Sequence, residues 1–209
     1  MAAPNNLPAN FFNSNSPRGV EFATPGTGFQ VSANAGVAPI EFDNINPTYS
    51  GLFQTFSPQR LFTAIGSNIT DVSFFVPGSA ALASVSAFGA VFTDVDLANT
   101  TSLQFFGLSN QSLGAPFFVP SAPAGTNATL SFLGVKFDAG ERIGRVRITS
   151  GNAALGGNES GATDLVVMDD FIYAEPLAVS LAVPEPATLL LVATPLAALV
   201  VLRRRRRQR

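Results

Sequence analysis

The stretch Val85-Ser-Ala-Phe-Gly-Ala-Val-Phe-Thr-Asp-Val95 decides the fold class of this 209-residue chain. It is rich in Val and Phe and lacks helical periodicity, which is typical of a strand. Five similar runs, each bounded by Gly, Asn, Pro or Ser, lie at 69–76, 102–108, 129–137, 143–149 and 165–173. Weaker candidates lie at 20–23, 29–33, 40–42, 60–65 and 117–119. The sequence therefore predicts an all-β protein.

The distribution of apolar residues indicates two packed sheets. Residues 73–76 and 104–107 are apolar on both sides of the strand, as expected for strands that are covered on both faces. In the run 143–149, Arg145 and Arg147 share one side, which predicts a solvent-facing surface. A lone sheet could not bury 19 Phe side chains. With turns about every ten residues, we expect an antiparallel jelly-roll-like β-sandwich.

Composition excludes much of the familiar enzyme chemistry. With no Cys and no His, the chain has no disulfide framework, no Cys/His zinc site, no Ser-His-Asp triad and no thiol nucleophile. The single lysine, Lys136, lies between Val135 and Phe137 and is expected to be an ordinary outward-facing strand residue. We therefore expect that the protein is not an enzyme.

Four aspartates are the candidates for site chemistry. Asp94 and Asp96 share one strand face, and Asp169–Asp170 interrupts an apolar run, where a bare carboxylate is costly. One interpretation is a structural Ca²⁺ bound by Asp94, Asp96 and Asp170 with nearby carbonyls, although the spacing is not that of an EF-hand. The other is hydrogen bonding to loop amides or pairing with the arginines of 143–149.

Paired carboxylates also allow a second class of function. Two acids can cleave a glycosidic bond without His, so a carbohydrate-active hydrolase that uses Asp pairs is an alternative. Against it, the chain has no Trp and only two Tyr, Tyr49 and Tyr173, for stacking on sugars.

The charge divides unevenly along the chain. Residues 1–182 carry a net charge of −7, whereas residues 183–209 carry +5, which together give the net charge of −2. An acidic body has no reason to hold a phosphate backbone, so nucleic acid is not an expected partner.

The C-terminal segment has three parts. Residues 183–186 (Val183, Pro184, Glu185 and Pro186) precede an uncharged apolar run at 187–202. As a helix this run rises about 24 Å, slightly less than the roughly 30 Å hydrocarbon core. It is followed by Arg203, Arg204, Arg205, Arg206 and Arg207. Because moving these arginines across the bilayer is prohibitive, we expect a single transmembrane helix with the body on the periplasmic or extracellular side. The alternative is a buried core helix with a basic tail, but the run lacks a polar face.

This order of Val-Pro-Glu-Pro, apolar span and terminal arginine cluster resembles the PEP-CTERM sorting signal of exopolysaccharide-producing Gram-negative bacteria. The resemblance implies that exosortase recognises Pro184, Glu185 and Pro186, that 187–202 is a transient anchor, and that the arginines at 203–207 stop transfer. Residues 85–175 resemble the β-sandwich ectodomains that often precede such signals. These resemblances imply an exported protein associated with exopolysaccharide.

The predicted organisation has five parts: a disordered segment at 1–18, a β-sandwich ectodomain at 19–175, a Pro-rich neck at 176–186, a transmembrane helix at 187–202 and a cytoplasmic tail at 203–209. Residues 1–8 lack the basic and apolar regions of a signal peptide, so we expect Met1 to be a misassigned or truncated start. We expect a non-catalytic cell-surface or matrix protein that is processed by exosortase. A permanently membrane-anchored structural protein is the alternative to processing.

Overall fold

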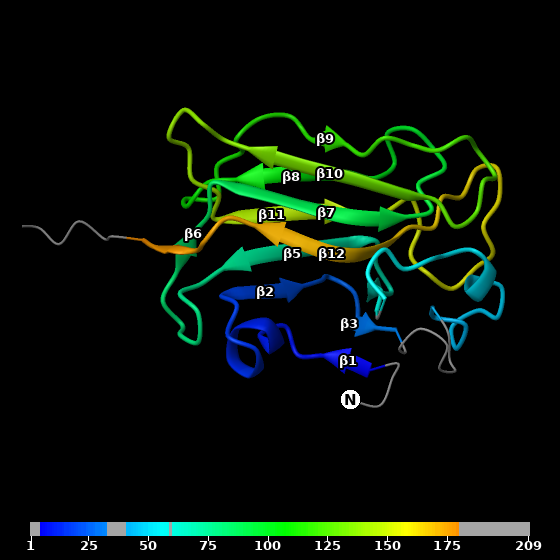
Figure 1. Ribbon diagram of the computed structural model, residues 1–209, viewed down its shortest axis with the longest axis horizontal. Helices are drawn as coiled ribbons and strands as arrows, with labels where there is room; N and C mark the ends of the chain where they lie inside the picture. Colours follow the sequence, from blue (N-terminus) through cyan, green and yellow to red (C-terminus); the bar gives the residue numbers. More distant parts are fainter. Residues whose placement is uncertain (1–4, 33–40, 59, 180–209) are drawn as a thin grey trace, which may run out of the picture. The chain divides into compact units, whose positions relative to one another are not determined.

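Antiparallel strands form nearly all the regular structure in the computed structural model, which describes residues 5–32, 41–58 and 60–179 (Figure 1). The strands are β1 (Asn5–Leu7), β2 (Val20–Ala23), β3 (Gly28–Val31), β4 (Phe62–Ile65), β5 (Ile69–Phe74), β6 (Ala83–Ser84), β7 (Ala87–Thr93), β8 (Ser102–Phe106), β9 (Phe117–Phe118), β10 (Leu130–Lys136), β11 (Arg145–Thr149), β12 (Val167–Tyr173) and β13 (Leu177–Ala178). Two helical turns, η1 (Phe11–Asn15) and η2 (Tyr49–Gly51), accompany them. The prediction of an all-β fold is confirmed.

The strands form two large sheets and one small one. The first sheet has the order β1-β3-β4-β12-β7-β10, the second has the order β2-β5-β11-β8-β9, and β13 pairs with β6. Every strand pairing is antiparallel. From β4 onward the chain passes repeatedly between the two large sheets, so loops collect at both ends.

The two large sheets enclose a common aromatic core, which makes the molecule a β-sandwich. Phe22 of β2 stacks on Phe29 of β3 with ring centroids 4.9 Å apart, and Phe74 of β5 meets Phe88 of β7 at 6.2 Å. A smaller second core lies beneath the 41–58 segment. It is built from Phe42, Tyr49, Leu52, Phe53, Leu61, Leu165 and Val167.

The six stronger predicted runs all contain a strand, namely β5, β7, β8, β10, β11 and β12. The run predicted at 40–42 differs, because residues 41–45 form a turn that buries Phe42 in the second core. On β11, Arg145 and Arg147 are partly exposed while Val146 and Ile148 are buried, so the predicted solvent-facing surface of this strand is confirmed.

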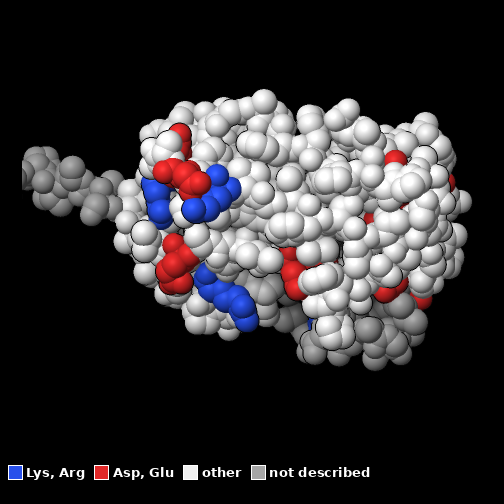
Figure 2. All heavy atoms as spheres, turned by 45° about the horizontal axis from the view of Figure 1, so that its top comes forward, with Lys and Arg blue, Asp and Glu red and all other residues white. Residues whose placement is uncertain are grey.

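Charged side chains on the outer surface pair with each other. Both arginines of β11 bind Asp71 of β5, with nitrogen–oxygen distances of 2.5 Å from Arg145 and 2.8 Å from Arg147. Lys136 is exposed, as expected, and lies 2.6 Å from Asp138. On the face shown in Figure 2 most of the surface is uncharged, and most of the charged side chains gather toward one end.

Residues 1–18 were predicted to be disordered, but residues 5–18 are ordered and packed against the rest of the sandwich. There β1 pairs with β3 through Asn5↔Val31 and Leu7↔Phe29, and the aromatic residues of η1 pack on the main core. Asn13 is buried and bonds to Ser79 and Gly78 through its amide. These long-range contacts supply the stabilisation that composition alone did not indicate.

The compact unit extends to Val179, beyond the predicted boundary at 175, because β13 pairs with β6 inside the predicted neck. The sorting motif at 183–186, the apolar run at 187–202 and the arginines at 203–207 lie outside the described residues. Within the described ranges, no helix has both the length and the apolar character needed to span a bilayer.

Candidate metal centre

Asp94 is placed by a sharp change of backbone direction at the end of β7. The strand ends at Thr93, and Asp94 adopts a left-handed conformation with φ of +70°, which Asp tolerates better than most residues. Its N–H donates to the carbonyl oxygen of Thr129 at 3.0 Å. This turn takes Asp94 out of the regular strand and starts the loop that also carries Asp96.

Asp96 is fixed by hydrogen bonds on two sides. Its N–H donates to Oδ1 of Asp164 at 2.9 Å, and its Oδ2 accepts the N–H of Gly125 at 2.7 Å. Asp164 is itself buried, and its Oδ2 accepts the hydroxyl of Thr100. Asp164 therefore positions the loop, and its own carboxylate is satisfied by donors.

Glu159 comes from the loop between β11 and β12, which the 41–58 segment holds in place. The Tyr49 hydroxyl donates to the carbonyl oxygen of Gly157 and accepts the N–H of Gly156, both at 2.7 Å. Asn46 adds a hydrogen bond from its Nδ2 to Oδ1 of Asn158 at 2.7 Å. These contacts make the residues before Glu159 part of a packed structure.

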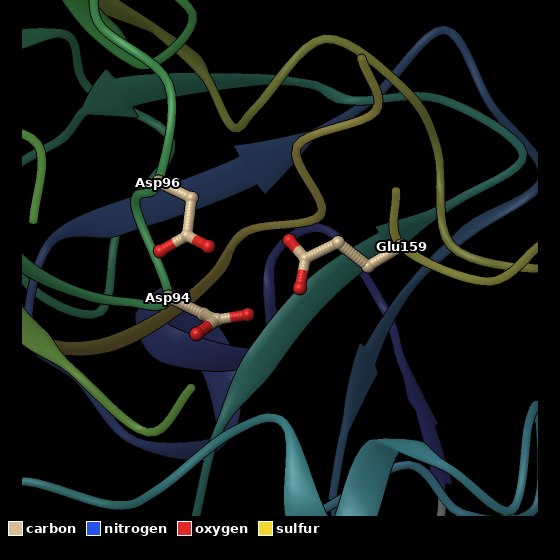
Figure 3. A group of neighbouring side chains, drawn as sticks. All are labelled: Asp94, Asp96 and Glu159. Carbon is tan, nitrogen blue, oxygen red and sulfur yellow. The ribbon is translucent and has the colours of Figure 1, made fainter. Parts of the chain in front are cut away.

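Asp94, Asp96 and Glu159, hereafter the carboxylate cluster, point their side chains toward one another (Figure 3). One carboxylate oxygen from each lies within 4.8 Å of the others. Asp94 is fully buried and Asp96 is 7% exposed. Both oxygens of Asp94, and Oδ1 of Asp96, lack a hydrogen-bond partner among the described residues. Leaving a buried carboxylate without a partner is expensive.

The proximity of the three acids changes their protonation. Burial, and then the negative charges of Glu159 and Asp96, raise the pKa of Asp94 to about 8. Burial also raises the pKa of Glu159, and the charge of Asp96 adds to this effect. At neutral pH the cluster therefore favours either a bound proton or a bound cation.

The ligand atoms in the carboxylate cluster are all hard oxygens. Such sets suit Ca²⁺ or Mg²⁺ rather than metals that prefer nitrogen or sulfur ligands. Four carboxylate oxygens are available for coordination once the hydrogen bonds of Gly125 to Asp96 and of Leu165 to Glu159 are counted. The cluster can therefore supply part of a cation's coordination shell, and the rest must come from other oxygens.

Asp170, the third predicted ligand, does not belong to the carboxylate cluster. Asp169 and Asp170 lie in a bulge of β12, where the register with β7 shifts. Asp169 is buried, and its Oδ2 accepts the N–H of Phe56 at 2.6 Å. Asp170 accepts the Ser57 hydroxyl at 3.0 Å. Donors from the 41–58 segment thus bind this pair, as the second interpretation of the sequence anticipated.

Glu159 was missed by the sequence reasoning because it lies in a Gly- and Asn-rich loop that looks like mobile surface. The available signal was weak: it is the single acid in residues 142–163. Nothing local indicates that this loop folds back over the end of β7.

A cavity of about 470 Å³ adjoins the carboxylate cluster and shares Asp96 and Glu159 with it. It is open to solvent on one side. The remaining lining residues are Thr48, Leu52, Leu97, Ala124, Gly125, Asn127, Asn158, Ser160 and Gly161.

Comparisons with known proteins add little to this geometry. No protein-family model and no curated protein sequence matches the chain. Among solved structures, the enzymatically active domain of tailspike protein 4 from bacteriophage CBA120 is similar, with a TM-score of 0.35 and 7% sequence identity. The match covers 81% of this chain and spans 20% of the tailspike chain.

The prediction that the protein is not an enzyme is contradicted by this comparison, because the similar structure is an enzymatically active domain. At this TM-score and identity the likeness transfers no activity to the present chain. The expectation that the protein is not an enzyme is therefore withdrawn.

Proposed function

We propose that the protein is an exported, calcium-binding β-sandwich of the cell surface or extracellular matrix. The observation that carries the calcium proposal is Asp94, which is fully buried, receives no hydrogen bond from an N–H or hydroxyl donor of the described residues, and faces the carboxylates of Asp96 and Glu159. A divalent cation would reduce both the electrostatic repulsion among the three carboxylates and the cost of burying Asp94. Asp94, Asp96 and Glu159 are the protein ligands in this proposal, and Asp170 is not one of them.

Calcium fits the carboxylate cluster better than magnesium does. Ca²⁺ accepts six to eight oxygens in flexible arrangements, whereas Mg²⁺ demands near-ideal octahedral geometry and keeps its water. The three carboxylates come from two loops and leave positions for carbonyl, water or ligand oxygens. Extracellular calcium modules work at dissociation constants of about 10⁻⁴–10⁻³ M, which suits a protein on the outer side of the membrane.

The C-terminal segment supports the export part of the proposal. The motif Val183-Pro184-Glu185-Pro186, the apolar run at 187–202 and the arginines at 203–207 follow the order of a PEP-CTERM signal. Exosortase then recognises the motif, the apolar run holds the chain in the membrane, and the arginines stay in the cytoplasm. The sandwich lies on the periplasmic or extracellular side, where it associates with exopolysaccharide.

The strand order supports a jelly-roll type of sandwich. One sheet contains the order β4-β12-β7-β10 and the other contains β5-β11-β8-β9. Eight antiparallel strands in two facing sheets are the usual composition of a jelly roll. In this arrangement β1, β2 and β3 extend the two sheets at one edge. The fold provides a rigid frame, and the function depends on the loops at its ends.

Calcium binding can be measured directly by isothermal titration calorimetry on the full-length chain after treatment with EDTA. We expect about one Ca²⁺ per chain, at least tenfold weaker binding in Asp94→Asn, and no change in Asp138→Asn, whose carboxylate is exposed and remote from the cluster. Absence of binding, or equal binding in Asp94→Asn, would falsify the calcium proposal.

Sorting is tested by mass spectrometry of the mature protein. We expect the surface pool to end near Pro184–Pro186, without the arginine cluster. An intact Arg209 in that pool contradicts processing and favours a permanently membrane-anchored protein instead. Exopolysaccharide association is tested by retention of the protein on the producing organism's native polysaccharide, and its failure there contradicts that part.

A further inference from the structure

The cavity beside the carboxylate cluster has two of the proposed calcium ligands in its wall. Asp96 and Glu159 belong both to the cluster and to the cavity lining, whereas Asp94 lies behind them and is fully buried. We propose that this cavity binds a neutral carbohydrate through the calcium ion, with two sugar hydroxyls completing the coordination shell. The inference rests on the proposed calcium site and names the class of ligand that it takes.

The number of ligand oxygens supports this assignment. Among the residues that the structure describes, none donates a hydrogen bond to either oxygen of Asp94 or to Oδ1 of Asp96, and one oxygen of Glu159 is not engaged by Leu165. These four oxygens fall short of the six to eight that Ca²⁺ takes. Because the cavity opens beside Asp96 and Glu159, the missing oxygens can come from a molecule that enters it. Adjacent hydroxyls of a sugar can supply two of them.

The charge of the site favours a neutral ligand over an acidic one. Three ionised carboxylates and one Ca²⁺ leave a net charge of −1 at the centre. Asp164, which is also buried, adds a further acid next to the cluster, because its Oδ1 accepts the N–H of Asp96 at 2.9 Å. A uronic acid would bring its own negative charge toward these groups, whereas a neutral hydroxyl pair would not.

The other lining residues fit a sugar. The amides of Asn127 and Asn158 and the hydroxyl of Ser160 offer hydrogen bonds, and Leu52 and Leu97 offer apolar surface. Asn127 uses its Nδ2 for Gly51 and Asn158 uses its Oδ1 for Asn46, which leaves the other end of each amide for a ligand. The volume of about 470 Å³ lies within the usual range of small-molecule sites, roughly 300–1,000 Å³.

The test uses saturation-transfer NMR on the full-length chain with methyl glycosides of glucose, galactose and mannose, and with methyl glucuronide. Calorimetry on the same sample first establishes whether Ca²⁺ is bound. We expect saturation of at least one neutral glycoside in Ca²⁺, its loss in EDTA, and its return when Ca²⁺ is restored. The glucuronide should give the weaker signal.

A cavity-filling variant separates the sugar site from the metal site. A Cβ at Gly161 meets no atom within 4 Å, so Gly161→Leu should fold and bind Ca²⁺ normally while reducing glycoside affinity at least tenfold. Gly157→Leu is the matched control, because it adds the same side chain in the same loop, also meets no atom within 4 Å, and does not line the cavity.

The outcomes distinguish the two proposals. A protein that binds Ca²⁺ but transfers saturation to none of the neutral glycosides overturns the carbohydrate inference and leaves the calcium site standing. Glycoside binding that persists in EDTA, that is unchanged in Gly161→Leu, or that is stronger for the glucuronide also overturns it. Failure to bind Ca²⁺ overturns both.

Discussion

Three buried aspartates, Asp94, Asp164 and Asp169, differ in the hydrogen-bond donors that their carboxylates receive. Asp164 accepts hydrogen bonds from Asp96 and Thr100, and Asp169 accepts the N–H of Phe56. Asp94 is equally buried but receives no such donor. Because the fold supplies donors to the first two, the lack of such donors at Asp94 is a property of this position, and the calcium proposal rests on it.

The raised pKa of Asp94 predicts an unusual dependence of stability on pH. A folded-state pKa of about 8, against an ordinary 3.8, means that the folded protein binds more protons than the unfolded chain between these values. The raised pKa values of Glu159 and Asp164 act in the same direction. In EDTA, the free energy of unfolding contributed by this group should therefore fall as pH rises from about 4 to 8.

This is measured by urea unfolding at several pH values, with and without Ca²⁺. Calcium should stabilise the folded protein more at pH 8 than at pH 5. At pH 5 the ion must displace protons from the carboxylate cluster, whereas at pH 8 many of these protons have already dissociated. A calcium effect that grows as pH falls would contradict the assignment.

The substitution Asp94→Asn should have opposite effects with and without the metal. In EDTA above a pH of about 8, where Asp94 is ionised, it removes the buried charge from beside Asp96 and Glu159, so we expect the free energy of unfolding to rise by roughly 1–3 kcal/mol. In Ca²⁺ it should lose most of the stabilisation by the metal. Thermal unfolding of both proteins in both buffers checks this, and a variant that is destabilised equally in both buffers points to a purely structural role.

Sequence reasoning found part of this site. Asp94 and Asp96 stood out because they share one face of a predicted strand. Asp170 stood out because Asp169–Asp170 interrupts an apolar run, but the bulge of β12 gives it a hydroxyl donor from Ser57, which is more than 110 positions away along the chain. The role of Glu159 depends on how its loop packs, and that information is not local.

At the scale of elements, the 41–58 segment is the support of the site. It carries η2, it covers the second core, and it holds the loop of Glu159 through Tyr49 and Asn46. It also supplies the donors for Asp169 and Asp170. One irregular segment therefore organises both acidic groups, although the only element predicted there was a short strand at 40–42, and residues 41–45 form a turn instead.

Removal of the Tyr49 hydroxyl should lower both the stability of the protein and its calcium affinity, although Tyr49 is not one of the proposed ligands. In Tyr49→Phe the N–H of Gly156 loses its partner, and the carbonyl of Gly157 keeps only the hydrogen bond from Asn46, so we expect a loss of roughly 1–2 kcal/mol in the free energy of unfolding. Calcium affinity should fall about tenfold because the loop of Glu159 is held less firmly. The measurements are urea unfolding and calorimetry. Tyr173→Phe is the control, because the Tyr173 hydroxyl donates to the carbonyl oxygen of Arg18 and to none of the loops of the carboxylate cluster, so this variant should bind calcium normally.

The long strands were predictable, and β2, β3, β4 and β9 coincide with weaker predicted runs, whereas three of the shortest strands were not predicted. Runs such as 129–137 and 165–173 carry enough β-branched and aromatic residues to define a strand by themselves. In contrast, β1, β6 and β13 have two or three residues each, and they exist because partners such as β3 are already in place. Pairing between distant segments, rather than local propensity, decides these elements.

At the scale of the whole molecule, the sandwich brings together segments that are far apart in the sequence. The 41–58 segment, the loop after β7 and the loop before β12 meet at one end, and the carboxylate cluster forms where they meet (Figures 1 and 3). The fold class followed from composition and strand pattern, whereas this meeting point depends on the path of the chain between the two sheets.

If the protein is exported to a calcium-containing environment, calcium binding should stabilise the whole folded domain. A ligand present at 100 times its dissociation constant stabilises the folded state by about 2.7 kcal/mol. We therefore expect the full-length chain to gain several degrees in Tm when Ca²⁺ is added at that excess, and much less from Mg²⁺ at the same concentration. Equal shifts with both ions would indicate non-specific screening instead of a calcium site.

Calcium binding by Asp94, Asp96 and Glu159 can be seen in a crystal structure of the full-length chain grown with Ca²⁺. We expect an anomalous scattering peak among the three carboxylates, with oxygen distances of about 2.3–2.6 Å to each. A cluster that contains only water, or a protonated Asp94 that donates to Glu159 in the presence of millimolar calcium, would contradict it.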